Sequence, residues 1–238
     1  MARTGELRNV LLASAFALLP VPPVVHAQEP AQAKPLPAPA AAQAEDWQLP
    51  GTFSQGTSLA DLQARFGTDN LRKVMPAADA YHCEEILFPD DPACRAHAFF
   101  YDCEKLDQLR SIEVRDRASR WRGKGGVHVG MSFAELRERN GKPFGFSGFD
   151  QDGTGTAQDQ WSPAIGDDAT LGKLDVEEGE RMYFDVRLGL RAGAPATDKA
   201  KLPRDSYFPS DDPRIPPLAP LLEVVGFGAS TSLDDEWE

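Results

Sequence analysis

The stretch that decides the fold occurs twice: residues 56–67 read GTSLADLQARFG, and residues 130–141 read GMSFAELRERNG. The two copies align without a gap at a constant offset of 74 residues. Both begin and end with glycine, and they share a serine, an alanine, a leucine and an arginine at matching positions. Similarity at a fixed offset predicts an internal repeat of one folding unit.

Each copy carries the signals of a short helix. Ser58 and Ser132 can cap a helix N-terminus with their hydroxyls, and an acidic residue three positions later is placed like the second half of a capping box. The closing glycine of each copy is typical of a helix end. We therefore predict helices over 59–66 and 133–140. Helices of this length are not stable alone, so each must pack on a larger surface.

Antiparallel strands are expected to supply that surface. Segments 181–190 show the clearest pattern, because apolar residues alternate with polar residues or glycine, as in a strand with one buried face. Other short segments rich in aromatic or branched residues also predict strands, at 83–88, 97–102 and 109–114 after the first copy and at 143–149 and 221–227 after the second. The sequence thus predicts an α+β fold of two tandem units, 47–121 and 122–238, each a short helix packed on antiparallel β-strands.

The first residues have the features of an export signal. Arg3 and Arg8 precede a short apolar run over Val10–Leu19, and Val25 and Ala27 then supply small residues at the positions that a signal peptidase reads. We therefore expect residues 1–27 to be a signal peptide cleaved after Ala27. Residues 28–46 are rich in proline and alanine and lack the large apolar side chains of a core, which indicates a disordered tether. The mature protein is then expected to be periplasmic or secreted, without a transmembrane segment.

Charge narrows the range of partners. The formal net charge is −12, and loss of Arg3, Glu6 and Arg8 with the signal peptide makes the mature chain one charge more negative. Nucleic acids and anionic membranes attract basic surfaces, so neither is an expected partner. We interpret the acidity mainly as a means of solubility.

The second copy resembles a known pattern. Residues 130–143 (GMSFAELRERNGKP) are similar to a helix start, G-[MT]-S/T-x-x-[ED]-[VL]-x-x-x-x-G-x-P, that occurs in SmpA/BamE-type outer-membrane assembly lipoproteins and in tandem-repeat beta-lactamase-inhibitor proteins. The wider pattern through Trp161 resembles an uncharacterised family of exported bacterial envelope proteins. The first copy departs from the pattern, with Asp69 in place of Pro143, and no cysteine for lipidation follows Ala27. The resemblance implies an envelope fold without a catalytic group.

The three cysteines lie close together in the sequence. With His82 and His97, Cys83, Cys94 and Cys103 could form a zinc site, because zinc takes thiolate and imidazole ligands. An exported chain meets an oxidising environment, in which cysteines pair instead. We expect one disulfide, with Cys83–Cys103 as the first choice, since these residues fall nearly opposite each other on two strands of a hairpin. No metal or cofactor is expected.

Catalytic motifs are not evident in the sequence. There is no G-x-S-x-G or H-E-x-x-H pattern, and His128 is expected on a strand rather than as a general base. FDQDGTG (149–155) resembles the start of a calcium loop, but the twelfth position is Trp161 instead of glutamate, so we expect a polar turn. A secreted hydrolase with an unrecognised carboxylate pair is the alternative function.

A protein-binding role is the main expectation. Phe149, Asp150, Asp152 and Trp161 place aromatic side chains beside a glycine-rich acidic turn, and aromatic residues with a polar rim are typical anchors of interfaces. The sequence predicts that these four residues edge a binding surface; the alternative is that the aromatic side chains are core residues on two strands. The expected partner is another envelope protein or a component of the cell surface.

Overall fold

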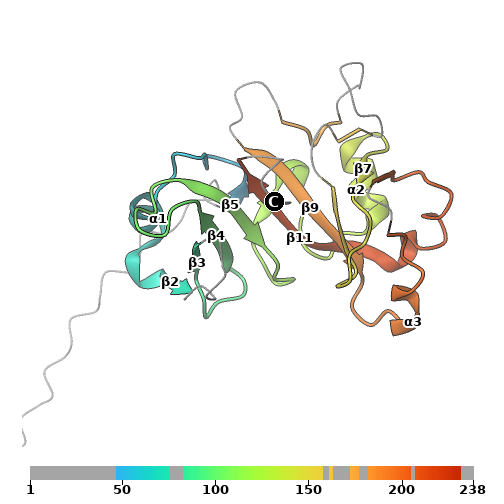
Figure 1. Ribbon diagram of the computed structural model, residues 1–238, viewed down its shortest axis with the longest axis horizontal. Helices are drawn as coiled ribbons and strands as arrows, with labels where there is room; N and C mark the ends of the chain where they lie inside the picture. The colour runs from blue at the N-terminus through green and yellow to red at the C-terminus, as the bar shows by residue number, and fades with distance from the viewer. Residues whose placement is uncertain are drawn as a thin grey trace, which may run out of the picture. The chain divides into compact units, whose positions relative to one another are not determined.

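The computed structural model describes residues 47–74, 83–157, 161–162, 172–176, 182–204 and 207–231. All of them belong to one compact unit that spans Ala38–Glu238. The predicted signal peptide and tether lie outside the described residues. The fold is α+β, as predicted, with a large antiparallel sheet and short helices (Figure 1).

A seven-stranded antiparallel sheet forms the centre, in the order β2-β3-β4-β5-β11-β9-β8. Its strands are β2 (Leu71–Val74), β3 (Cys83–Leu87), β4 (Ala96–Phe100), β5 (Leu109–Val114), β8 (Thr154–Ala157), β9 (Tyr183–Leu190) and β11 (Leu222–Ser230). Because β5 pairs with β11, the two stretches predicted as separate units contribute to one continuous sheet.

Two smaller strand pairs and the helices complete the described part. The pairs are β1 (Gln48–Leu49) with β6 (Arg122–Gly123), which is parallel, and β7 (Gly145–Phe146) with β10 (Phe208–Pro209), which is antiparallel. The helices are α1 (Leu59–Phe66), α2 (Phe133–Asn140) and the one-turn α3 (Ala196–Lys199), with 3-10 turns η2 (Thr68–Asn70), η3 (Lys124–Gly126) and η4 (Ala219–Leu221). β6 lies at the predicted unit boundary and returns to pair with the first described strand.

Both predicted eight-residue helices are confirmed with their bounds. Ser58 forms a complete capping box with Asp61 at the start of α1. Ser132 accepts a hydrogen bond from the Glu135 backbone at the start of α2. Gly141 ends α2 in the left-handed conformation, with φ of 80° and ψ of 0°. The end of α1 differs, because the extended ψ of the closing glycine leads the chain directly into η2.

One face of the sheet, here called the inner face, carries the core. In β9, Phe184, Val186 and Leu188 point to this face and are at most 2% exposed. Gly123 of β6 lies directly against it, since a Cβ at that position would sit 2.4 Å from the Phe184 ring and 3.1 Å from the Phe227 ring. A side chain at position 123 would therefore separate β6 from the sheet.

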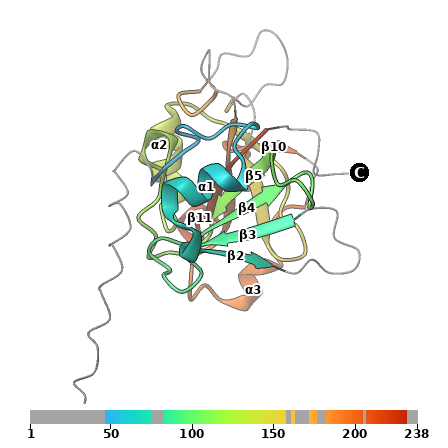
Figure 2. The ribbon, with the colours of Figure 1, turned by 90° about the vertical axis from the view of Figure 1, so that its left-hand side faces the viewer.

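α1 packs on the inner face through an aromatic cluster. Phe66 lies 5.8 Å from the Trp47 ring, 5.9 Å from Phe88 and 6.0 Å from Trp121, measured between ring centroids. The Trp121 indole donates a hydrogen bond of 2.7 Å to the backbone oxygen of Cys94. The cluster therefore joins α1 to Trp47 and Trp121, which lie near the two ends of the first predicted unit. Figure 2 shows α1 beside β3, β4 and β5.

α2 packs on the same face through a second aromatic cluster. Phe133 of α2 lies 5.8 Å from Phe144 and 6.2 Å from Phe146. Phe146 and Phe149 reach β8 because Gly155 has no side chain, so that a Cβ there would lie 3.3 Å and 3.5 Å from the two rings. Both eight-residue helices therefore cover the inner face.

Asn140, the last residue of α2, is fully buried and links three segments. Its Nδ2 donates to the backbone oxygens of Trp161 (2.7 Å) and Lys142 (3.1 Å). Its Oδ1 accepts a hydrogen bond of 3.3 Å from the Leu174 backbone. The amide thus holds two otherwise distant loop segments against the end of the helix.

We expect Asn140→Ala to lower the free energy of unfolding by about 2–3 kcal/mol, because it leaves buried backbone groups of Trp161 and Leu174 without a partner. Urea denaturation followed by circular dichroism would measure the change. Glu138→Ala, on the exposed side of the same helix, is the matched control and should shift stability by less than about 0.5 kcal/mol. Equal effects of the two variants would contradict this role of Asn140.

Candidate functional site

Two of the four residues predicted to edge a binding surface lie in the core. Phe149 is 2% exposed and Trp161 is 1% exposed. The Phe149 ring packs 5.7 Å from Phe146, and the Trp161 ring stacks 5.9 Å from Phe184. Their side chains therefore hold the second aromatic cluster together and offer no surface to a partner.

The other two, Asp150 and Asp152, lie on an exposed turn. Asp150 accepts hydrogen bonds of 2.9 Å from both the backbone nitrogen and the hydroxyl of Thr154. Partial burial opposes ionisation of Asp150, but the hydrogen bonds from Thr154 and from the backbone of Gly153 and Asp152 together outweigh it, and the pKa of Asp150 is lowered. This carboxylate serves as a turn-forming acceptor, as expected for a polar turn, and partner binding by the turn stays a prediction.

The cysteines form the predicted disulfide. Cys83 is bonded to Cys103, with 5.2 Å between their Cα atoms. Cys94 is free and buried, and burial together with Asp91 raises the pKa of its thiol to about 11. Two of the five candidate zinc ligands are thus consumed by the disulfide, and His82 lies outside the described residues.

No metal site is formed by the part of the chain that the structure describes. It holds no cluster of three or more histidine, cysteine, aspartate or glutamate side chains suited to a metal ion. His128 was expected on a strand, and this expectation was wrong. The residue lies in the loop before α2, where its Nδ1 is 3.3 Å from the Gly126 backbone oxygen. The 3-10 turn η3 directly precedes Val127, so the alternating valines do not form a strand.

The face of the sheet opposite α1 and α2, here called the open face, gathers polar side chains. The register places them in rows across the strands. One row runs from Ile86 through His97, Glu113 and Gly228 to Asp185, and its neighbour contains Phe99, Ser111, Ser230 and Tyr183. Most of these side chains are half-buried, which is typical of a sheet surface without a packed helix.

Ion pairs organise the centre of the open face. Glu113 on β5 accepts a hydrogen bond of 2.9 Å from Arg115 Nε, and its other oxygen lies 3.8 Å from Arg187 Nη2 of β9. On the other side of the row, His97 Nδ1 lies 2.6 Å from Glu84 Oε1. Glu113 is thus compensated by Arg115, two residues further along the chain, and by Arg187, which reaches it across the intervening strand β11.

Two glycines of β11, Gly226 and Gly228, lie beneath these side chains. A Cβ at Gly228 would lie 3.2 Å from both carboxylate oxygens of Asp185, and one at Gly226 would lie 3.7–3.8 Å from the stems of Arg115 and Arg187. The side chains of Arg115, Asp185 and Arg187 therefore extend across the surface of β11. Sequence reasoning missed this surface, although the polar positions that alternate through 183–190 were a usable signal.

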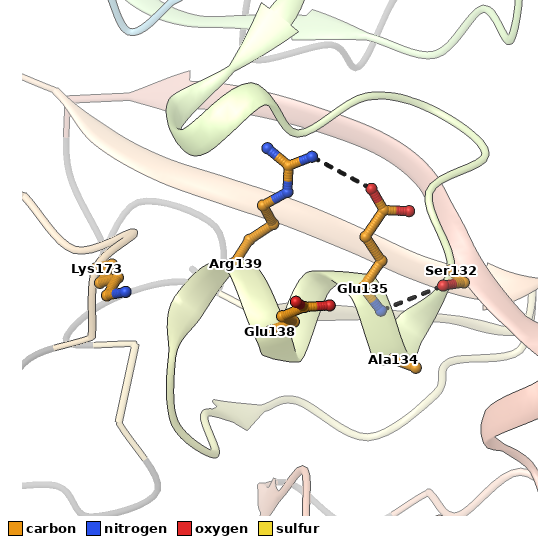
Figure 3. Close-up of a pocket in the computed structure, with 6 residues that line it drawn as sticks. All are labelled: Ser132, Ala134, Glu135, Glu138, Arg139 and Lys173. Carbon is orange, nitrogen blue, oxygen red and sulfur yellow. Dashed lines mark hydrogen bonds and ion pairs between the residues drawn. The ribbon is translucent and has the colours of Figure 1, made fainter.

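A hollow of about 760 Å³ lies along α2 (Figure 3). Its two carboxylates do not face each other: Glu135 points toward Arg139, 3.4 Å away, whereas Glu138 extends to another side of the helix. The remaining lining residues are Ser132, Ala134 and Lys173. This arrangement is an ordinary exposed helix surface and does not have the facing carboxylates of a glycoside hydrolase.

One buried carboxylate stands apart from these surfaces. Glu85 of β3 is 4% exposed on the inner face, opposite Lys73 of β2. Its burial raises its pKa, although the charge of Lys73 acts in the opposite direction. Glu85 therefore makes the edge of the core sensitive to pH.

Comparison with protein-family models, curated proteins and solved structures found no match to this chain. Within the described ranges, no helix has the length and apolar character needed to cross a bilayer.

Thiol titration would test the cysteine assignment. We expect the native protein to show no rapid reaction with Ellman's reagent at pH 8, because Cys94 is buried and its thiol pKa is about 11. After unfolding in guanidinium without reductant, one thiol per chain should react. Three reactive thiols in the unfolded, unreduced protein would contradict the disulfide.

Glu85→Gln should remove part of the pH dependence of stability. The raised folded-state pKa means that Glu85 favours the native state below its unfolded pKa, and that this stabilisation is lost as pH rises through the folded value. At pH 7.5 the variant should melt roughly 2–4 °C higher than the parent, the shift that about 1 kcal/mol produces in a chain of this size. At pH 4 the difference should shrink or vanish. The control Glu138→Gln should leave both melting temperatures unchanged, and an equal response of the two variants would refute this role for Glu85.

Proposed function

We propose that this protein is a non-enzymatic, exported binding or assembly module of the bacterial cell envelope. The observation that carries the proposal is the open face of the seven-stranded sheet. Both eight-residue helices pack on the inner face, and the open face presents half-buried charged and hydroxyl side chains from β4, β5, β11 and β9. A broad polar sheet surface of this kind suits a partner protein better than a small substrate.

The chemistry of the open face favours binding over catalysis. Glu113 and Asp185 are the carboxylates that flank Gly228 in register. Glu113 is neutralised by two arginines, Arg115 and Arg187. A hydrolase would need one of its carboxylates to act as an acid or a nucleophile toward substrate. The ion-paired Glu113 is better suited to exchange partners with charges on another protein, so the alternative of a secreted hydrolase has less support.

A tandem origin of the fold is part of the proposal. The two capped helices keep the 74-residue offset in their observed bounds. β5 and β11, the last described strand of each predicted unit, pair antiparallel at the centre, and the strands that precede them extend outward on either side in the order β4-β3 and β9-β8. This arrangement is what two related units joined by a local two-fold relation would produce.

The disulfide supports the proposed location. A bond such as Cys83–Cys103 persists in oxidising compartments and is rare in the reducing cytosol. Together with the export signal expected at residues 1–27, it favours the periplasm or the exterior of the cell.

Site-specific photocrosslinking in intact cells would test the function. A benzoylphenylalanine placed at Thr156 or Ser230 projects from the open face, and we expect discrete cross-linked adducts with a partner at these positions. The same probe at Ala134 or Glu138, on the exposed side of α2, is the control and should give no adduct.

Mass spectrometry of the adducts would identify the partner. Adducts from α2 alone would place the binding surface elsewhere and refute the role of the open face. If no position gives an adduct and the purified protein hydrolyses envelope glycans in a manner that Glu113→Gln abolishes, the hydrolase alternative replaces the proposal.

A further inference from the structure

The two edge strands of the large sheet, β8 and β2, differ in whether their outward backbone groups are hydrogen-bonded. At the β8 edge, the Ser147 backbone nitrogen donates to Thr156 O (2.8 Å), and the Thr156 nitrogen donates to Ser147 Oγ (2.8 Å). The Asp150 nitrogen donates to Thr154 O (2.8 Å). The segment before β8 thus satisfies the outward backbone groups of that strand and closes this edge.

The β2 edge lacks such a cover in the described residues. The Phe88 nitrogen donates to Asn70 O (2.6 Å), so the backbone groups of Arg72 face β3 and those of Leu71 and Lys73 face outward. The Leu71 nitrogen is used internally, by Thr68 O. The carbonyls of Leu71 and Lys73 and the nitrogen of Lys73 therefore point outward with no hydrogen-bond partner in the described part of the chain.

The side chains of this edge are basic, although the chain as a whole has a net charge of −12. Arg72 pairs in register with Ile86 and so belongs to the open face, whereas Lys73 pairs with Glu85 and belongs to the inner face. Among the residues that the structure describes, Arg72 makes one ion pair, an exposed contact of 3.5 Å with Asp90, whose side chain is 90% exposed. Exposed pairs of this kind contribute little and exchange easily.

We propose that β2 is a strand-addition site for an extended segment of a partner protein that carries two consecutive acidic residues. The backbone of such a segment would bond to the outward groups of Leu71 and Lys73 and extend the sheet by one strand. Successive side chains of a strand point to opposite faces. Two adjacent acidic residues would therefore lie opposite Arg72 on one face and Lys73 on the other, where cross-strand pairs of opposite charge are favourable.

A short basic edge also discourages pairing between copies of the same protein. This simpler role predicts that no peptide binds at β2. The proposal differs from it in predicting a selective complex with an acidic strand, and it adds backbone contacts at the β2 edge to those proposed for the open face.

The test measures binding of fluorescein-labelled peptides by anisotropy at low and moderate salt. The probe is a hexapeptide with the order Thr-Val-Asp-Glu-Val-Thr, and the control peptide has two lysines at its centre. We expect the acidic peptide to bind and the basic peptide to bind at least tenfold more weakly. Two N-methylated versions of the acidic peptide test the backbone contacts. Methylation of the alternate nitrogens that face β2 should abolish binding, whereas methylation of the other nitrogens should leave binding unchanged.

Variants of the protein separate the backbone contribution from the charge. Lys73→Pro removes the outward N–H, which an edge strand tolerates, and should weaken binding more than tenfold. Lys73→Gln keeps that N–H and should weaken binding less. Arg187→Glu, on the distant strand β9 of the open face, should leave peptide binding unchanged. The peptide test and the crosslinking test thus concern different residues, so a negative result with the peptides would not decide the proposed function.

Three outcomes would overturn the proposal. They are equal affinity for the acidic and basic peptides, binding that survives both patterns of N-methylation, and association of the protein with itself that Lys73→Pro abolishes. The last result would assign the edge to contacts between copies. Should Lys73→Pro fail to fold, the methylated peptides still decide the question with the parent protein.

Discussion

The pairing of β5 with β11 is the contact on which the rest of the structure depends. Only four register pairs join these strands, Ser111–Val114 against Phe227–Ser230, yet they make one sheet from two halves. Beside them, the pairing of β11 with β9 holds the Phe227 and Phe184 rings 6.3 Å apart, and both rings receive Gly123 of β6. Without this pairing the two aromatic clusters would be separate and small, and neither eight-residue helix would have a sufficient surface.

The position of the core explains why one face of the sheet is available. Most aromatic side chains that follow each helix lie on the inner face, whereas Phe99 and Tyr183 lie on the open face. Most of the remaining positions on the open face are therefore left to residues that tolerate water. β11 illustrates the consequence, with Phe227 and Ala229 directed into the core and Gly226 and Gly228 on the open face. Charged side chains of the flanking strands fill the space above these glycines and compensate one another.

The sequence predicted best those elements whose signals are local. The capped helices and the alternating strand β9 were expected with nearly their observed bounds, because capping and alternation are properties of neighbouring residues. β2 and β8 were missed, since LRKV and TGTA are short and carry little apolar pattern. Phe149 and Trp161 were placed at a surface because their burial depends on partners far along the chain: Phe208 packs 6.4 Å from Phe149, and Phe184 stacks 5.9 Å from Trp161. The open face depends on strand order, which connects residues more than a hundred positions apart.

The order of the strands also governs what an incomplete chain would be. β11, an interior strand between β5 and β9, comes last among the described strands, after all the others on either side of it. A chain that is synthesised from its N-terminus therefore holds β5 and β9 as two unpaired edges until residue 230 has been added. Fragments that stop earlier would present unpaired backbone on both halves and would be open to proteolysis. Because of this topology, the edges of β5 and β9 become paired only when the chain includes β11.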